Sequence, residues 1–227
     1  MAGGSDAMRL GAVVDRDLVA DRIAARAAPL PDLRRPAERT DERPPPQPGP
    51  ARATGPSPGV VVDEVDYGRI DATRIPSGIG AAAFVARAVI DATRHHAALN
   101  GGSGPVHLGV AGGVVRDADA LRLRALAAAI DRAEEGDGAT IALRDGSEGA
   151  RLTIAPPVAG TPCVAIGRAA MRPVARTGPD GEWALTMRPV GDLSLSFDAG
   201  AIDIADATAF LGAVRQTLEQ RDWEAEL

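Results

Sequence analysis

The chain of 227 residues has one cysteine, Cys163, no lysine and an aromatic content of only 3%. A single cysteine excludes an internal disulfide and a zinc site built from cysteines. The scarcity of aromatic rings argues against a surface that stacks on bases or sugars. No apolar run approaches the roughly 20 residues needed to span a bilayer, and no secretory leader precedes Met8. We therefore expect a cytoplasmic protein without a membrane partner.

Positive charge is also scarce, because 31 acidic residues outnumber 25 arginines and give a formal net charge of −6. Nucleic-acid binding depends on clustered positive charge, so we expect no nucleic-acid partner. Hydrophobic residues make up 45% of the chain and charged residues 25%. This balance is typical of one ordinary globular domain accompanied by some disordered sequence.

The sequence divides into three segments. Residues 1–28 predict an amphipathic helix, with apolar residues on one face and Pro29 after its end. Residues 29–58 are rich in proline and charge. They predict a disordered linker, because they contain too little apolar surface to offset the entropy of ordering. Residues 59–227 predict the folded domain, in which strand and helix patterns are interspersed.

The patterns within the folded domain predict a mixed sheet with helices on one face, an α/β fold of the α+β two-layer sandwich type. The sequence Gly178-Pro-Asp-Gly181 predicts the turn of a hairpin. Helices are expected at 79–94, at 119–134 and after Asp203. The expected strands are 60–66, 106–111, 140–143, 151–154, 163–168, 172–175, 183–188 and 193–197.

The segment LSLSFDAGAIDIADATAFL, residues 193–211, combines a strand that alternates apolar and polar residues, typical of half burial, with a turn and an amphipathic helix. It resembles the closing motif of the dihydrolipoyl acyltransferase catalytic domain of 2-oxo acid dehydrogenase complexes, a family related to chloramphenicol acetyltransferase. That motif reads approximately LSLSxDHRxxDGAxAxxFL. Asp198 and Asp203 match it, whereas Ala199 occupies the position of the histidine and Gly200 that of the arginine.

Further segments resemble the same family in the same order, so that the resemblance spans about residues 59–218. It implies a chloramphenicol acetyltransferase-like fold and a homotrimer whose active sites lie between subunits. The segments are VVDEVD at 61–66, HHAALN at 95–100, LGVA at 108–111, VRDAD at 115–119, TPCVAIG at 161–167 and RPV at 172–174.

Acyl transfer needs a base that takes the proton from the nucleophile and a donor that stabilises the oxyanion of the tetrahedral intermediate. In the family that the chain resembles, the motif histidine is the base, and a serine in an FTISN-type strand hydrogen-bonds the oxyanion. Here Ala199 and Ala155 occupy those two positions. Losing a base costs about 10²–10⁴-fold in rate, and losing an oxyanion donor about 10²–10³-fold. The resemblance therefore implies a degenerate site that no longer transfers acyl groups.

Other polar residues could take over part of this chemistry. His107 is the candidate substitute base, and Asp198 would be a weaker base if it were desolvated. Asp203 either orders the active-site loop, as the resemblance implies, or caps the final helix together with Asp206, which the spacing favours. Cys163 is interpreted as a small core residue rather than a nucleophile. For each residue a structural interpretation is favoured, and the functional alternative stays open.

Three hypotheses follow for the function. The first is a non-catalytic scaffold or accessory subunit that forms a homotrimer or assembles with a paralogous acyltransferase. The second is a repurposed enzyme that transfers an acyl group from coenzyme A to a small-molecule hydroxyl or thiol. The third is a module that binds coenzyme A or an acyl ligand. The first requires no cofactor, a coenzyme A thioester is the ligand of the other two, and no metal site is expected.

Overall fold

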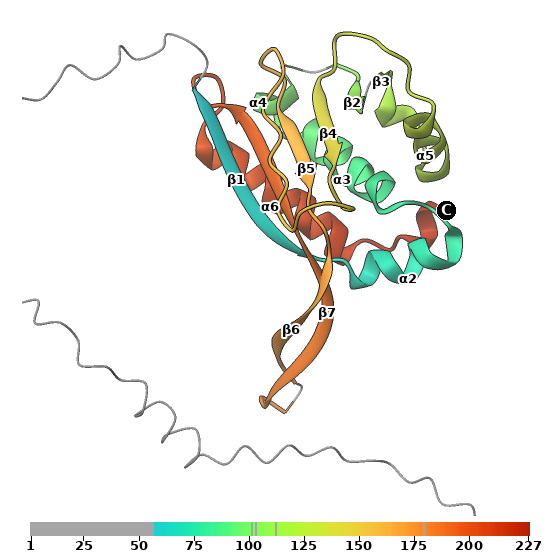
Figure 1. Cartoon of the computed structure of the whole chain (residues 1–227), viewed down its shortest axis with the longest axis vertical. Coiled ribbons are helices and arrows are strands. Elements are labelled where there is room, and N and C mark those ends of the chain that lie inside the picture. The colour runs from blue at the N-terminus through green and yellow to red at the C-terminus, as the bar shows by residue number, and fades with distance from the viewer. Residues whose placement is uncertain (1–56, 101, 103, 112, 179) are drawn as a thin grey trace, which may run out of the picture. The chain divides into compact units, whose positions relative to one another are not determined.

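A single mixed sheet of seven strands forms the centre of the part of the chain that the structure describes (Figure 1). The strand order is β1-β7-β5-β4-β2-β3, with β6 paired to β7 outside this row. β2, β4 and β5 are parallel to one another, and β7 is antiparallel to β1, β5 and β6. The strands are β1 (Pro58–Asp66), β2 (Leu108–Val110), β3 (Gly113–Val115), β4 (Ile141–Asp145), β5 (Cys163–Ile166), β6 (Ala170–Thr177) and β7 (Trp183–Asp198).

The computed structural model describes residues 57–227 except 101, 103, 112 and 179. The helix predicted at 1–28 lies outside the described residues, and so does the predicted linker up to residue 56. Pro58, the last residue of that linker, is the first residue of β1.

Helices α3 and α6 lie against one face of the sheet (Figure 1), as the sequence predicts. The face of α6 that packs there carries apolar residues at helical spacing, and its buried members are Ala207, Phe210, Leu211, Val214 and Leu218. Phe84 of α3 packs edge-to-face on Trp223 with ring centroids 5.2 Å apart. The helices are α2 (Gly68–Ser77), α3 (Ala81–His95), α4 (Ala97–Asn100), α5 (Leu123–Asp131) and α6 (Ile204–Gln220), with short 3-10 turns η1 (Ala118–Ala120) and η2 (Glu224–Glu226).

β7 continues from a hairpin directly into the centre of the sheet. Its first half pairs with β6 and its second half with β1 and β5. The predicted hairpin is confirmed, and its turn is closed by the Gly178 N–H, which donates to the Glu182 carbonyl at 2.8 Å. We call the paired segments Ala170–Thr177 and Trp183–Val190 the arm, which extends away from the other strands in Figure 1.

The predicted half burial of residues 193–197 is wrong, because both faces of this part of β7 are covered. Leu195 and Phe197 are fully buried, yet Ser194 on the opposite face is also fully buried. The chain after β4 crosses that face, and the Ser194 hydroxyl donates to the Thr153 carbonyl at 2.6 Å.

The strand predicted at 151–154 is also wrong, since these residues form no ladder. The alternation of apolar residues there is real, but β4 and β7 already pair with both edges of β5. The segment therefore lies across the sheet instead of joining it. Helix α2 went unpredicted because it contains Pro76 and buries few apolar residues. None of the helices in the described residues combines the length and the apolar character that crossing a membrane requires.

Candidate active-site region

The turn between β7 and α6 holds the residues that align with the acyltransferase motif. Ala199 follows the last residue of β7, is exposed, and donates its backbone N–H to the Ser57 carbonyl at 2.8 Å. The half-buried Asp198 accepts the Gly200 N–H on Oδ1 at 2.9 Å. Its carbonyl accepts the N–H groups of Ala201 and Ile202. The Asp198 carboxylate therefore stabilises the turn, beside a methyl group that can neither accept nor donate a proton.

Asp203 is the N-cap of α6. Its Oδ1 accepts the Ala205 N–H at 2.7 Å, and Asp206 lies in the first turn of the helix. This arrangement satisfies one of the free N–H groups at the helix start and suits the helix dipole. The capping interpretation of Asp203 is thus confirmed, and the exposed carboxylate has a structural partner within its own helix.

Ala155 lies in the irregular segment that crosses the sheet face opposite the helices. It is half-buried, and Pro156 and Pro157 follow it. Thr153, two residues earlier, is held over β7 by the hydroxyl of Ser194. Proline has no N–H and alanine has no polar side-chain atom. Residues 155–157 therefore offer an oxyanion no side-chain donor, and the backbone N–H of Ala155 is the one donor left among them.

His107 immediately precedes β2 and fastens two segments of backbone together. Its Nδ1 accepts the Asp117 N–H at 3.1 Å, and its own N–H donates to Thr140 Oγ1 at 2.6 Å. Asp117 has a left-handed φ of 48°, a conformation that aspartate adopts more readily than most non-glycine residues and that the bond to His107 helps to hold. Because Nδ1 is an acceptor, the neutral ring carries its proton on Nε2, an assignment that follows from the hydrogen bond. Acting as a base at Nδ1 would require this bond to break.

The strand order separates His107 from Asp198. Both lie at the same end of the sheet, but β4 and β5 stand between β2 and β7. Three strand spacings of about 4.8 Å place the two backbones about 14 Å apart. The structure therefore brings Asp198, Ala199 and Asp203 into one turn and leaves His107 outside their hydrogen-bond reach within one chain.

Two residues beside this turn are conspicuous for their burial. Ser196 is 1% exposed, and its hydroxyl has no hydrogen-bond partner among the described residues. Cys163 faces it across the β5–β7 ladder and is equally buried. Burial raises the pKa of the Cys163 thiol, although the charge of Arg144 opposes this effect. A neutral, enclosed thiol matches the core role predicted for Cys163. The alternation of LSLS predicts Ser196 on the polar face of a half-buried strand, so its burial, like that of Ser194, differs from the prediction.

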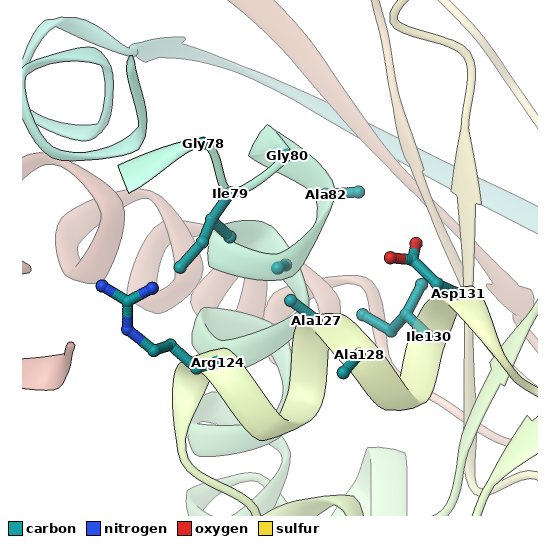
Figure 2. A pocket seen from close by; sticks show the side chains of 10 residues that line it. Gly78, Ile79, Gly80, Ala82, Arg124, Ala127, Ala128, Ile130 and Asp131 are labelled. Carbon is teal, nitrogen blue, oxygen red and sulfur yellow. The ribbon is translucent and has the colours of Figure 1, made fainter. Parts of the chain in front are cut away.

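A pocket of about 280 Å³ lies elsewhere, between the start of α3 and helix α5 (Figure 2). Figure 2 shows Arg124 and Asp131 toward opposite ends of α5, with alanines between them. Its other lining residues are small or apolar. Since no set of polar groups converges on one point there, this pocket offers no arrangement for acyl transfer.

The sequence matches no protein-family model and no curated protein. Among solved structures, 52 chains match. A probable dihydrolipoamide acetyltransferase from Listeria monocytogenes is 18% identical, with a TM-score of 0.61 over 74% of this chain and 87% of that chain. The cubic core of a pyruvate dehydrogenase multienzyme complex is 20% identical, with a TM-score of 0.62 over 75% and 84%.

The dihydrolipoamide acetyltransferase of Azotobacter vinelandii is 21% identical, with a TM-score of 0.61 over 75% of this chain and 84% of that chain. That structure concerns the roles of a serine, a histidine and an asparagine in its catalytic mechanism. At these identities the likeness shows the fold. The folded part of the protein thus has the fold of the dihydrolipoamide acetyltransferase catalytic core.

Proposed function

We propose that the protein is a non-catalytic member of this fold that acts as a self-assembling scaffold or accessory subunit. The observation that carries the proposal is Ala199 at the end of β7, where the resemblance places the catalytic base. Ala155 adds a second methyl group at the position of the oxyanion donor. Both chemical demands of acyl transfer are then unmet.

The two candidate substitute bases support this proposal because each already accepts a hydrogen bond. The Asp198 carboxylate accepts a backbone N–H of its own turn, and His107 Nδ1 accepts another. His107 would have to give up this bond before its Nδ1 could act as a base. In Asp198 the bond from the Gly200 N–H occupies Oδ1 and leaves only the second carboxylate oxygen. A scaffold requires no coenzyme A thioester, and binding of that ligand without turnover would instead favour a ligand-binding module.

The arm supports the assembly part of the proposal. Successive side chains of a strand point to opposite faces, so alternate residues of β7 share one face with their partners on β6. Its large apolar side chains are 54–78% exposed: Met171, Trp183, Leu185 and Met187. An exposed apolar face of this kind typically marks an interaction surface.

The opposite face of the arm is turned toward its own chain by ion pairs. Arg188 and Arg176 donate to Asp66 at 2.7 and 2.9 Å, and Arg172 donates to Glu64 at 2.8 Å. Burial alone would raise the pKa of Asp66, but hydrogen bonds from Arg188 and the Gly68 N–H, with the charges of Arg188 and Arg176, lower it. These pairs hold the charged face inward and leave the apolar face outward.

A second copy of the chain is the partner that we propose for this apolar face. The same chain exposes apolar residues on and beside the outer sheet face, namely Val60, Val62, Leu152, Ile154 and Val158. An arm that binds this different surface on a neighbour makes a heterologous contact, and such contacts generate rings where the rotation closes. We propose the homotrimer that the resemblance implies, with the arm at each interface.

The catalytic part is tested by coenzyme A release from acetyl-CoA in the presence of dihydrolipoamide. The proposal expects release at the rate of buffer alone. Release above that rate, abolished by Asp198→Asn or His107→Gln, would instead support the repurposed enzyme. A thermal-shift measurement with coenzyme A in the same samples separates binding from turnover.

A further inference from the structure

The backbone of the sheet shows which strand edges are open to a further strand. In an antiparallel ladder, residues directly opposite each other alternate between pairs that exchange both backbone hydrogen bonds and pairs that exchange none. Every second residue of a strand therefore points its N–H and C=O groups to one side, and the residues between point theirs to the other side. One bond or one proline of known position thus fixes the direction for the whole strand.

The arm turns the backbone groups of its odd-numbered residues outward. In the β6–β7 ladder, Pro173 lies opposite Met187 and Pro189 lies opposite Met171. Proline has no N–H to give to a ladder, so these pairs are the ones without hydrogen bonds. The Tyr67 N–H supports this direction, because it donates to the Pro189 carbonyl from the side of β7 opposite β6, at 2.8 Å.

The first open edge is therefore the β7 side of the arm. The ladder of β1 with β7 reaches only to the pair of Asp66 with Val190. Before that point, the outward N–H and C=O groups of Trp183, Leu185 and Met187 have no partner among the described residues. The β6 edge of the arm differs, because Pro173 interrupts its row of donors.

β1 is the outermost strand of the row β1-β7-β5-β4-β2-β3 (Figure 1), and the second half of its outer edge is capped. The Tyr67 N–H points to β7, so the even-numbered residues of β1 point theirs outward. The Glu64 N–H donates to Asp63 Oδ1 at 2.9 Å. The Asp66 N–H donates to Glu219 Oε1 at 3.0 Å. Side chains of the same chain thus satisfy this half of the edge.

The second open edge is the first half of β1, which has no such caps. The N–H groups of Val60 and Val62 have no acceptor in the part of the chain that the structure describes, and the two side chains are 41% and 49% exposed. The stretch Pro58–Val62 therefore matches Trp183–Met187 in length, in open backbone groups and in apolar side chains. Open strand edges of this kind are templates for pairing with another chain.

Building on the self-assembly proposed above, we infer that the arm of one subunit extends the sheet of the next by pairing along β1. Trp183–Met187 lies antiparallel to Pro58–Val62 of the neighbour, with Leu185 opposite Val60. Residues directly opposite each other share a face, so the apolar side chains of both stretches meet, and such cross-strand pairs stabilise a sheet. Pairing of arm with arm would leave the β1 edge open, whereas pairing of two different edges is the heterologous contact that a ring requires.

The backbone bonds are tested by Leu185→Pro, which removes one outward N–H from the β7 edge. Ala175→Pro is the matched control, because Ala175 lies directly opposite Leu185 and its N–H faces outward from the interrupted β6 edge. Leu185→Ala accounts for the lost side chain. In sedimentation equilibrium of the full-length chain, Leu185→Pro should weaken the trimer about tenfold more than Leu185→Ala, and Ala175→Pro should leave it as in wild type.

The outcomes separate the pairing from the assembly itself. A trimer that is as stable in Leu185→Pro as in Leu185→Ala overturns the pairing and leaves the proposed assembly standing. A wild-type dimer points to arm-to-arm pairing and overturns the inference, and a wild-type monomer overturns the assembly as well. Circular dichroism of each variant shows whether the chain is folded.

Cross-linking tests the partner strand in chains that keep the native backbone. The chain has one cysteine, Cys163, which is buried, so introduced cysteines are the accessible thiols. Oxidation with copper-phenanthroline in air should join chains that carry Val60→Cys with Leu185→Cys into covalent species of up to three chains. Val60→Cys with Ala175→Cys, on the other edge of the arm, should stay single. No cross-link in the first pair, or equal cross-linking in the second, overturns the inference.

Discussion

Replacing Trp183 and Leu185 together with serine should break the proposed trimer. The two side chains are 75% and 78% exposed on the outward face of the arm, so most of their surface is free to be buried by a neighbour. Full burial of a large apolar side chain is worth about 1.5–3 kcal/mol. About three-quarters of that value for each residue gives about 2–4 kcal/mol per arm, or roughly a 30- to 1,000-fold weaker contact.

Sedimentation equilibrium of the full-length chain measures this effect. We expect wild type to sediment near 70 kDa, as three chains of 23.2 kDa, and the double variant to dissociate toward the single-chain mass. The control is Ala184→Ser with Thr186→Ser, two neighbours on the opposite face of the same strand, which should stay trimeric. Circular dichroism should be unchanged in both variants. A wild-type monomer, or a double variant as trimeric as the control, refutes the reasoning.

Further predictions concern the capping residue Asp203 and two partly buried carboxylates, Asp66 and Asp91. Asp203→Ala should lower the free energy of unfolding by about 1 kcal/mol in urea denaturation, because α6 loses its N-cap bond. Burial alone would raise the pKa of Asp91, but the Arg87 hydrogen bond and charge, with Arg221, lower it, and Asp66 is also lowered. Because the pKa of each carboxyl group is lower in the folded state, the ionised groups stabilise the fold at pH values above their ordinary pKa of 3.8. This stability is lost as the pH falls through the folded-state pKa. Melting temperatures measured from pH 6 to pH 2 should therefore fall in the acid range, and less steeply in a folded Asp91→Asn variant.

Each of these outcomes has a clear contrary result. Unchanged unfolding of Asp203→Ala would show that the carboxylate does not stabilise α6. A melting temperature that rises toward low pH would contradict the sign of the two pKa shifts. Asp91→Asn keeps the side-chain shape, so a failure to fold would be separated from the pH effect by its circular dichroism at neutral pH.

The elements that the sequence predicts well are those whose local pattern agrees with their final environment. α6 follows from apolar residues at helical spacing, and the hairpin turn follows from two glycines around a proline and an aspartate. Asp203 could be predicted as a cap because its spacing to Asp206 is a local signal. In each case the information lies within a few residues.

The features that the sequence predicts wrongly or not at all depend on tertiary contacts, which no local pattern encodes. Residues 151–154 alternate like a strand, but both edges of β5 are taken, so tertiary structure decides against a ladder. The burial of Ser194 arises from the same crossing segment. A pocket lined by Tyr67, Asp145 and Ile166, among others, is formed by elements distant in sequence, so no local pattern predicts it.

The most direct test of the account returns both polar groups to the positions that now hold methyl side chains. Coenzyme A release from acetyl-CoA with dihydrolipoamide is measured side by side for wild type and for Ala199→His combined with Ala155→Ser. We predict that wild type matches buffer and that the double variant releases coenzyme A measurably faster. Wild-type release well above buffer, with no gain in the double variant, would contradict a silenced acyltransferase fold.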